Sequence, residues 1–413
     1  MTLRVPEHVH KKIRKIQGYG LVLITFLSFF PRWFHLEEYL FFVLLLIALA
    51  AAWLESKAIW TRTPIDMPLL LLVAWVLLTV PFATDPAYSF AEWRKLAAQV
   101  LVFYWALLVL RTGNNGTTTQ AISAAVVLGT AVMGVYTLFD FVERGGTWKD
   151  RFVRAGAPSS DYNWLSTYMV MAVPILVAAG IAFRAQWQRL ACVCTVGLAL
   201  VAQAISYTRA GWLGLIAQGL AFGLLTGRRK LALWVLGGCL VIGVGLVAVS
   251  KVGYHRDTVD PWTLNARLSF WQQGFHQIMQ HPIVGLGYGN NTFMPVVTGL
   301  PTGDSPMGLH STFLMVGVGS GVPALIFLIW VLIQTVWSLV KVAQKVLDRG
   351  TYALLIGTAI MVIGFATRNV FDYMFAGSLA YLFWILAATG MVKMMAQRDA
   401  CSSWSKAATV QPH

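Results

Sequence analysis

The feature that most constrains the fold is a succession of long apolar stretches that fills almost the whole chain. A helix needs about 20 apolar residues to cross a bilayer, and many of these stretches approach that length. Hydrophobic residues make up 57% of the 413 residues and charged residues only 12%, against about 25% charged residues in an ordinary soluble domain. A soluble surface could not be covered by so few charges, and a disordered chain would be more polar.

The sequence therefore predicts an all-α polytopic membrane protein with about 12 transmembrane helices, because helices satisfy their own backbone hydrogen bonds in lipid. We treat residues 1–413 as a single membrane domain. The predicted spans are 17–34, 36–54, 67–82, 96–110, 120–142, 164–183, 190–207, 211–226, 231–250, 311–340, 351–370 and 376–397.

Basic residues indicate the orientation of these helices. Lys and Arg concentrate in cytoplasmic loops, and most of the 31 in this chain fall on one side if both termini are cytoplasmic. The basic stretch from Lys11 to Lys15 precedes the first span, which we interpret as an uncleaved helix. The net charge of +14 then lies on the cytoplasmic face, where it contacts anionic headgroups of membrane lipids. It does not indicate a nucleic-acid partner.

The outer face carries two sizeable loops, 143–163 and 251–310. Within the second loop, apolar residues recur at spacings of three and four near 264–280, from Leu264 to Met279. This spacing predicts an amphipathic helix, which Pro282 follows. Its apolar face is expected to lie on the membrane interface or on the helix bundle.

Sequence motifs for nucleotides and metals are absent. There is no Gly-x4-Gly-Lys-Ser/Thr loop, and the run from Gly285 to Gly289 lacks the context of a dinucleotide site, so we interpret it as a tight turn. The four cysteines do not have the spacing of a zinc site. We expect no cofactor and no metal, and an activated donor on the outer side must then arrive on a lipid.

Four groups of outer polar residues stand out because cations there oppose the positive-inside trend. An arginine wedged between two apolar runs, as Arg209 is, is costly unless it is paired or faces a polar cavity. The other groups are also compatible with solvated charges or ordinary polar residues. The candidates are Arg151, Arg154 and Asn163; Thr208 and Arg209; Arg267 and His281; and His310 and Ser311.

Three arginines brought together on the outer face would bind a pyrophosphate, because each offers charge-assisted, fork-shaped hydrogen bonds. Such a clamp stabilises the charge that develops on a leaving phosphate. A histidine beside it could accept a proton from an attacking sugar hydroxyl. Whether these groups converge is a question for the structure.

In this order, around a large outer loop, the motifs resemble those of the O-antigen ligase family. They are Arg154-x-Gly156 with Asn163, Ser206-x-Thr208-Arg209-x-Gly211, Arg267-x3-Trp271 with His281-Pro282-x2-Gly285-x-Gly287, and His310-x2-Phe313-Leu314-x2-Gly317. The resemblance implies a bacterial inner-membrane enzyme with its active site facing the periplasm. It would transfer an O-antigen glycan, with inversion and without metal, from undecaprenyl pyrophosphate to lipid A–core. The implied fold resembles the GT-C-type membrane glycosyltransferases.

By position, His310 matches the catalytic histidine of that family, and Arg154, Arg209 and Arg267 match its pyrophosphate-binding arginines. The chain departs from the family where Ser311 replaces a common Asn and Tyr162 replaces a common Pro. Two alternatives in the same superfamily remain open, an O-antigen polymerase and a protein O-oligosaccharyltransferase. A transporter or flippase for an anionic lipid is an alternative of another class.

Overall fold

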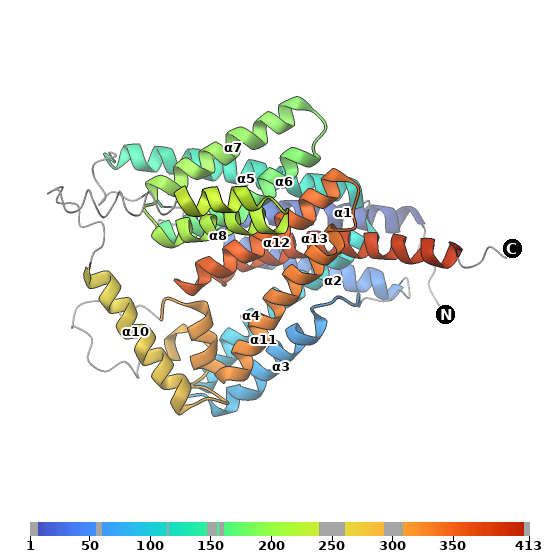
Figure 1. Cartoon of the computed structure of the whole chain (residues 1–413). Helices are drawn as coiled ribbons and strands as arrows, with labels where there is room; N and C mark the ends of the chain where they lie inside the picture. Colours follow the sequence, from blue (N-terminus) through green and yellow to red (C-terminus); the bar gives the residue numbers. More distant parts are fainter. Residues whose placement is uncertain are drawn as a thin grey trace.

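The computed structural model describes a helical bundle with its two ends clearly distinguished (Figure 1). Both termini lie at one end, and the separate helix α10 lies at the other (Figure 1). The described part of the chain contains no β-strand. The described residues are 7–54, 60–113, 115–146, 155–156, 161–238, 261–292 and 309–408.

The apolar stretches form helices close to where the sequence places them. The residues 229–238 are also helical, at the start of the predicted span 231–250, whose remainder lies outside the described residues. The labelled helices are α1 (Glu7–Leu27), α2 (Phe34–Leu54), α3 (Asp66–Thr79), α4 (Pro86–Thr112), α5 (Asn115–Glu143), α6 (Tyr162–Ala182), α7 (Gln186–Ile205), α8 (Arg209–Leu225), α10 (Pro261–Gln280), α11 (Thr312–Ala343), α12 (Arg349–Val370) and α13 (Gly377–Ala408).

The prediction of a polytopic helical membrane protein is confirmed. Within the described ranges, eight helices are long and apolar enough to cross a membrane: α2, α4, α5, α6, α7, α11, α12 and α13. The helices α3 and α8 are apolar but shorter. The helix α1 begins in the basic N-terminal segment and ends at Leu27, which leaves too few apolar residues for a span. The described helices therefore do not support the expected count of about 12 spans.

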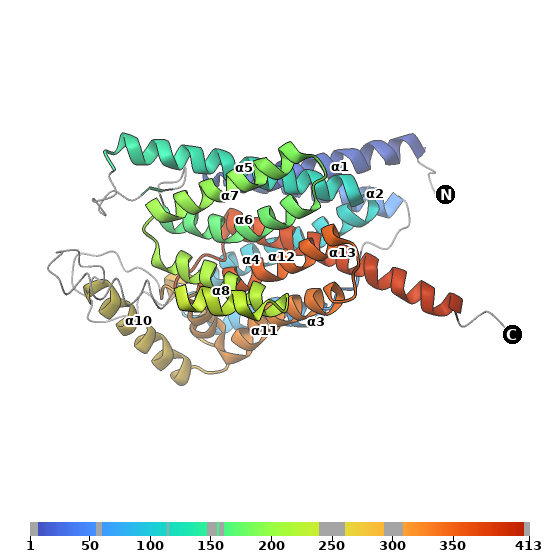
Figure 2. The same ribbon diagram turned by 45° about the horizontal axis from the view of Figure 1, so that its top comes forward.

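The helices α12 and α13 run through the middle of the bundle (Figure 2). Among the eight spans α13 is the most buried, at 83%, whereas α2 and α7 are 28% and 33% buried and lie at the periphery. The helix α12 packs on α6, α8, α11 and α13. Polar groups at the Val370 end of α12 therefore meet the ends of several helices at once.

The helix α11 is broken between its first turns and its long second half. Ser320 and Gly321 have non-helical backbone angles, and Gly321 has φ 77°, which favours glycine. The freed backbone groups pair with the loop after α10, because Leu286 N donates to Val318 O at 2.8 Å and Val322 N donates to Pro282 O at 2.8 Å. The glycine-rich run thus does more than turn the chain, since it replaces helical hydrogen bonds that the break removes.

The helix α10 occupies the region in which the sequence predicts an amphipathic helix. It packs on the first half of α11, so the segment that carries Arg267 lies against the segment that begins just after His310. The contact is a separate apolar cluster away from the main core. Its buried members are Phe270, Ile278, Leu286, Leu309, Leu314, Met315 and Val318.

Candidate functional site

The loop that joins α12 to α13 carries a buried carboxylate, Asp372. His310 Nδ1 lies 2.9 Å from Asp372 Oδ1, and Arg368 Nη1 donates to Asp372 Oδ2 at 2.6 Å. The side chains of Arg368 and Asp372 are 0% and 2% exposed, whereas that of His310 is 22% exposed. The histidine is therefore held from its buried side and open on the other.

A second set of hydrogen bonds joins this cluster to the start of α6. Arg368 Nη2 donates to the side-chain Oδ1 of Asn163 at 3.1 Å and to its backbone oxygen at 3.4 Å. Asp161 caps α6, because its carboxylate accepts from the backbone N–H groups of Asn163 and Trp164. The cap fixes the first turn of α6 and, with it, the position of Asn163.

The start of α11 is tied to the same loop. Thr312 N donates to Asp372 O at 3.2 Å, and the Thr312 hydroxyl donates to Asn369 Oδ1 at 2.6 Å. Ser311 caps α11 by accepting from Leu314 N, so this candidate residue has a local structural role. His310 has φ 47°, a region that residues other than glycine adopt rarely. These contacts on both sides hold the strained histidine backbone in place.

Arg267 approaches the cluster from α10. Its Nη2 lies 4.0 Å from Asp372 Oδ1, and its side chain is 31% exposed. That distance is an ion pair without a hydrogen bond. The ring of Phe270, one turn further along α10, lies 6.3 Å from the His310 ring. Arg267 thus stands at the open side of the cluster with its hydrogen-bond donors directed to Asp372 only loosely.

The electrostatic environment shifts the pKa values of the two carboxyl groups of the site, Asp372 and Asp161, in opposite directions. Burial alone would raise the pKa of Asp372, but the hydrogen bond from His310 and the charges of Arg368 and Arg267 together hold it below its ordinary value. For Asp161, burial dominates and raises the pKa, although two backbone N–H groups and Arg368 act in the other direction. The pKa values of the two carboxyl groups are therefore shifted in opposite directions within one cluster.

The candidates Thr208 and Arg209 lie at the corner between α7 and α8. Arg209 is the first residue of α8 and is exposed. The Thr208 hydroxyl donates to Tyr162 O at 3.4 Å, so this corner is joined to the start of α6 one residue before Asn163. The structure brings the corner to the α6 end, but it shows no direct contact of Arg209 with Asp372.

The remaining candidates are Arg151, Arg154 and His281. Arg151 and Arg154 lie outside the described residues. Their described neighbours are held near α5 and α7, because Ala155 N donates to Ile205 O at 3.2 Å and Gly156 N to Asp140 Oδ2 at 3.3 Å. His281 is exposed just after the end of α10, about 20 Å along the helix axis from Arg267 at 1.5 Å per residue. It is not brought to Asp372.

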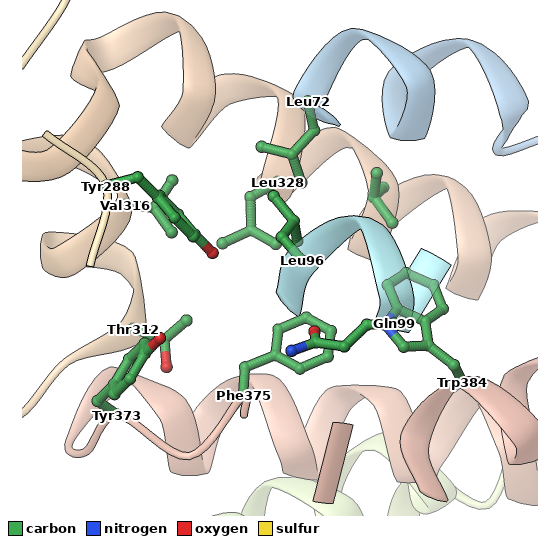
Figure 3. A pocket seen from close by; sticks show the side chains of 11 residues that line it. Leu72, Leu96, Gln99, Tyr288, Thr312, Val316, Leu328, Tyr373, Phe375 and Trp384 are labelled. Carbon is green, nitrogen blue, oxygen red and sulfur yellow. The ribbon is translucent and has the colours of Figure 1, made fainter. Parts of the chain in front are cut away.

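A small cavity of about 20 Å³, with room for about one water molecule, lies next to the cluster, between α3, α4, α11 and α13 (Figure 3). Thr312 and Tyr373, which adjoin the cluster, line one side of it, and Gln99 and Trp384 line the other (Figure 3). Leucine, valine and aromatic side chains form most of the remaining wall. The cavity is therefore mostly apolar and too small to hold a sugar ring.

Sequence reasoning missed Arg368 and Asp372. Arg368 ends an apolar run in the same way as Arg209 follows one, so the argument from the high energy of a cation there applied equally. The acidic residue four positions later was a further signal, because i,i+4 pairs of opposite charge lie on one helix face. For metals, the described residues contain no group of three or more His, Cys, Asp or Glu that could hold an ion.

The comparisons with known proteins agree with the resemblance. Residues 194–329 match the family model described as O-antigen ligase. The matched region contains Arg209, Arg267 and His310, whereas Arg368 and Asp372 lie beyond its end. No curated protein matches the chain.

Proposed function

We propose that the chain is a member of the O-antigen ligase family, whose model matches residues 194–329, and that it is a glycosyltransferase acting on a lipid-linked glycan. The donor is an O-antigen glycan on undecaprenyl pyrophosphate, and the acceptor is lipid A–core. The reaction takes place at the periplasmic end of the bundle, with both termini in the cytoplasm. The loops 143–163 and 251–310 are then periplasmic, and the chain lies in the bacterial inner membrane in a GT-C-like arrangement.

The observation that carries this proposal is the pairing of His310 with Asp372 beside Arg267. Because Nδ1 of His310 faces the carboxylate, Nε2 is the ring nitrogen that remains for a substrate. A carboxylate bonded to Nδ1 selects this tautomer and stabilises the imidazolium that forms when Nε2 takes a proton. The geometry is that of a general base, His310, oriented by a buried carboxylate, Asp372.

In the proposed reaction His310 Nε2 accepts the proton of the acceptor sugar hydroxyl. The freed oxygen forms a bond to the anomeric carbon of the donor from the side opposite the pyrophosphate, which inverts the configuration. The bond between the anomeric carbon and the pyrophosphate oxygen breaks, and its electron pair leaves on the undecaprenyl pyrophosphate. Arg267, with Arg209 and Arg154, stabilises this negative charge.

The test is glycan transfer by the purified protein, with the lipid-linked glycan as donor and lipid A–core as acceptor, in the presence of a chelator. Replacing the base in His310→Ala is expected to reduce transfer by about 10²–10⁴-fold. The matched control is His276→Ala, an exposed histidine on α10, which should retain activity. A folded His310→Ala protein with near wild-type transfer contradicts the role of the histidine.

The acceptor decides between the related activities. Transfer to lipid A–core alone supports the ligase, transfer to another lipid-linked O-unit supports a polymerase, and transfer to a protein supports an oligosaccharyltransferase. Lipid movement across a vesicle membrane without any transfer would identify a flippase instead. A chelator that abolishes the product overturns the metal-independent reaction.

A further inference from the structure

Two arginines contact the same carboxylate in different ways. Arg368 bonds Asp372 Oδ2 at 2.6 Å from a fully buried position, whereas Arg267 stands 4.0 Å from Oδ1 with 31% of its side chain exposed. The two arginines approach different oxygens of this carboxylate. The short contact compensates the negative charge of Asp372 and keeps it ionised, and the long contact leaves Arg267 able to bind another anion.

Arg368 is also fixed from a second direction, the start of α6. Its Nη2 donates to both oxygens of Asn163, and Asp161 fixes the α6 turn that carries Asn163. Its Nε, in contrast, has no hydrogen-bond partner in the described part of the chain. A buried arginine that is this constrained and 0% exposed has no path to a phosphate on the donor.

We infer that Arg368 is a positioning residue, which locks Asp372 against the start of α6 so that Asp372 orients His310 while Arg267 stays available to the donor. This inference rests on the proposed function. It assigns opposite tasks to two arginines that charge alone would not distinguish. Arg368 acts through Asp372 and does not touch the substrate.

The inference has a consequence for the dependence of transfer on pH. The groups that face Asp372 are Arg368 on α12, Arg267 on α10 and His310 before α11, and Asp161 before α6 adds a second negative charge nearby. Removing Arg368 leaves burial, which raises the pKa of Asp372, less opposed. If the ionised carboxylate is needed, the acid limb of the kcat profile moves to higher pH in Arg368→Gln.

The first experiment measures kcat and KM of the donor in Arg368→Gln, Arg368→Lys and Arg267→Gln. Arg368→Gln is expected to lower kcat about 10–100-fold, the range for partners that orient a histidine, with little change in donor KM. Arg368→Lys should restore part of kcat and of the pH profile, because it keeps the charge. Arg267→Gln should raise donor KM. The control is Arg349→Gln, at the opposite end of α12, which should resemble wild type.

A donor KM that rises in Arg368→Gln as much as in Arg267→Gln, with an unchanged pH profile, overturns the inference. Because Arg368→Gln leaves a buried carboxylate unpaired, it could also fail to fold. The double variant Arg368→Gln/Asp372→Asn removes both charges and provides a second test. Its kcat should equal that of Asp372→Asn alone, since Arg368 acts only through Asp372.

A double variant far less active than Asp372→Asn shows that Arg368 acts on its own and overturns the inference. All comparisons are ratios to wild-type transfer. If wild type transfers no glycan from the lipid donor, the proposed function fails before the role of Arg368 is tested. The two failures are therefore distinguishable.

Discussion

The two carboxyl groups near the start of α6, Asp372 and Asp161, have opposite chemical surroundings. Asp372 is bonded by an imidazole and a guanidinium, and its pKa is lowered in spite of burial. Asp161 is bonded mainly by two backbone N–H groups, and burial raises its pKa. They interact electrostatically with each other and with Arg368, so the difference arises within one cluster.

The difference shows that the hydrogen-bond donors around a buried carboxyl group determine the role of that group. Full positive charges keep Asp372 ionised, as a group that stabilises a protonated histidine must be. Backbone dipoles give Asp161 a helix cap but less compensation for burial. Environments that shift the pKa values of two titratable groups in opposite directions are common in catalytic sites. Each prediction below tests whether these two carboxyl groups have separate tasks.

The largest effect is expected from Asp372→Asn compared with Asp161→Asn. The first removes the charge that stabilises the His310 imidazolium, and the transfer rate should fall by about 10²–10⁴-fold. The second keeps an oxygen that can cap α6, because Asn caps nearly as well as Asp, and should reduce transfer much less. Initial rates of glycan transfer measure both. Equal losses would show that the two carboxyl groups are not separate in function.

The next effect is expected from Arg267→Ala, which removes the partly exposed cation beside Asp372. Losing a group that stabilises the departing pyrophosphate should lower kcat/KM by about 10²–10³-fold. The exposed Arg32, near the start of α2, provides a matched control in Arg32→Ala. If both variants lose the same activity, general surface charge and not the cluster determines the rate.

Opposite dependences of stability on pH are the third prediction. The lowered pKa of Asp372 means that its stabilising contribution is complete above its ordinary pKa near 4 and disappears as pH falls through the lowered value. The raised pKa of Asp161 has the reverse sign, because its ionisation opposes folding as pH rises above about 4.

Denaturant unfolding in detergent from about pH 3 to about pH 7 measures both contributions. The free-energy difference between wild type and Asp372→Asn should grow as pH rises. For Asp161→Asn, the free energy of unfolding of the variant should increase relative to that of wild type as pH rises. Parallel curves for both variants contradict the assigned directions of the two pKa shifts.

The smallest effect is expected from Asp161→Ala, which removes the cap of α6. Losing a capping side chain costs about 1 kcal/mol of unfolding free energy, and Asp161→Asn should restore most of it. The same unfolding experiment measures this at a single pH. A loss several times larger would mean that Asp161 stabilises more than the first turn of α6.

Most of the helices could be predicted from the sequence because lipid requires long apolar segments with internal hydrogen bonds. The exceptions have physical reasons. The basic segment at Lys11 shortens the apolar part of α1, and the break at Gly321 depends on pairing with residues near Pro282, a contact that no local pattern indicates.

The candidate site could be predicted only in part. Local motifs identified His310 and Arg267, and the structure adds their common partner, Asp372. The partner was missed because it lies 62 residues from His310 in the chain, and because Arg368 was counted only as an outer charge. Hydrogen bonds between distant residues depend on packing, which periodicity does not reveal.

The glycine contacts between the loop after α10 and the break in α11 limit how such proteins can be recombined. A Cβ on Gly321 would lie 2.1 Å from Ile283 O, and one on Gly285 would lie 2.5 Å from Val318 O. Neither neighbour is a side chain that can turn away. A chimera between relatives that exchanges only the outer loop, or only α11, separates surfaces that fit at backbone distance. Residues 282–322 are thus the smallest block that protein engineers should exchange as a unit.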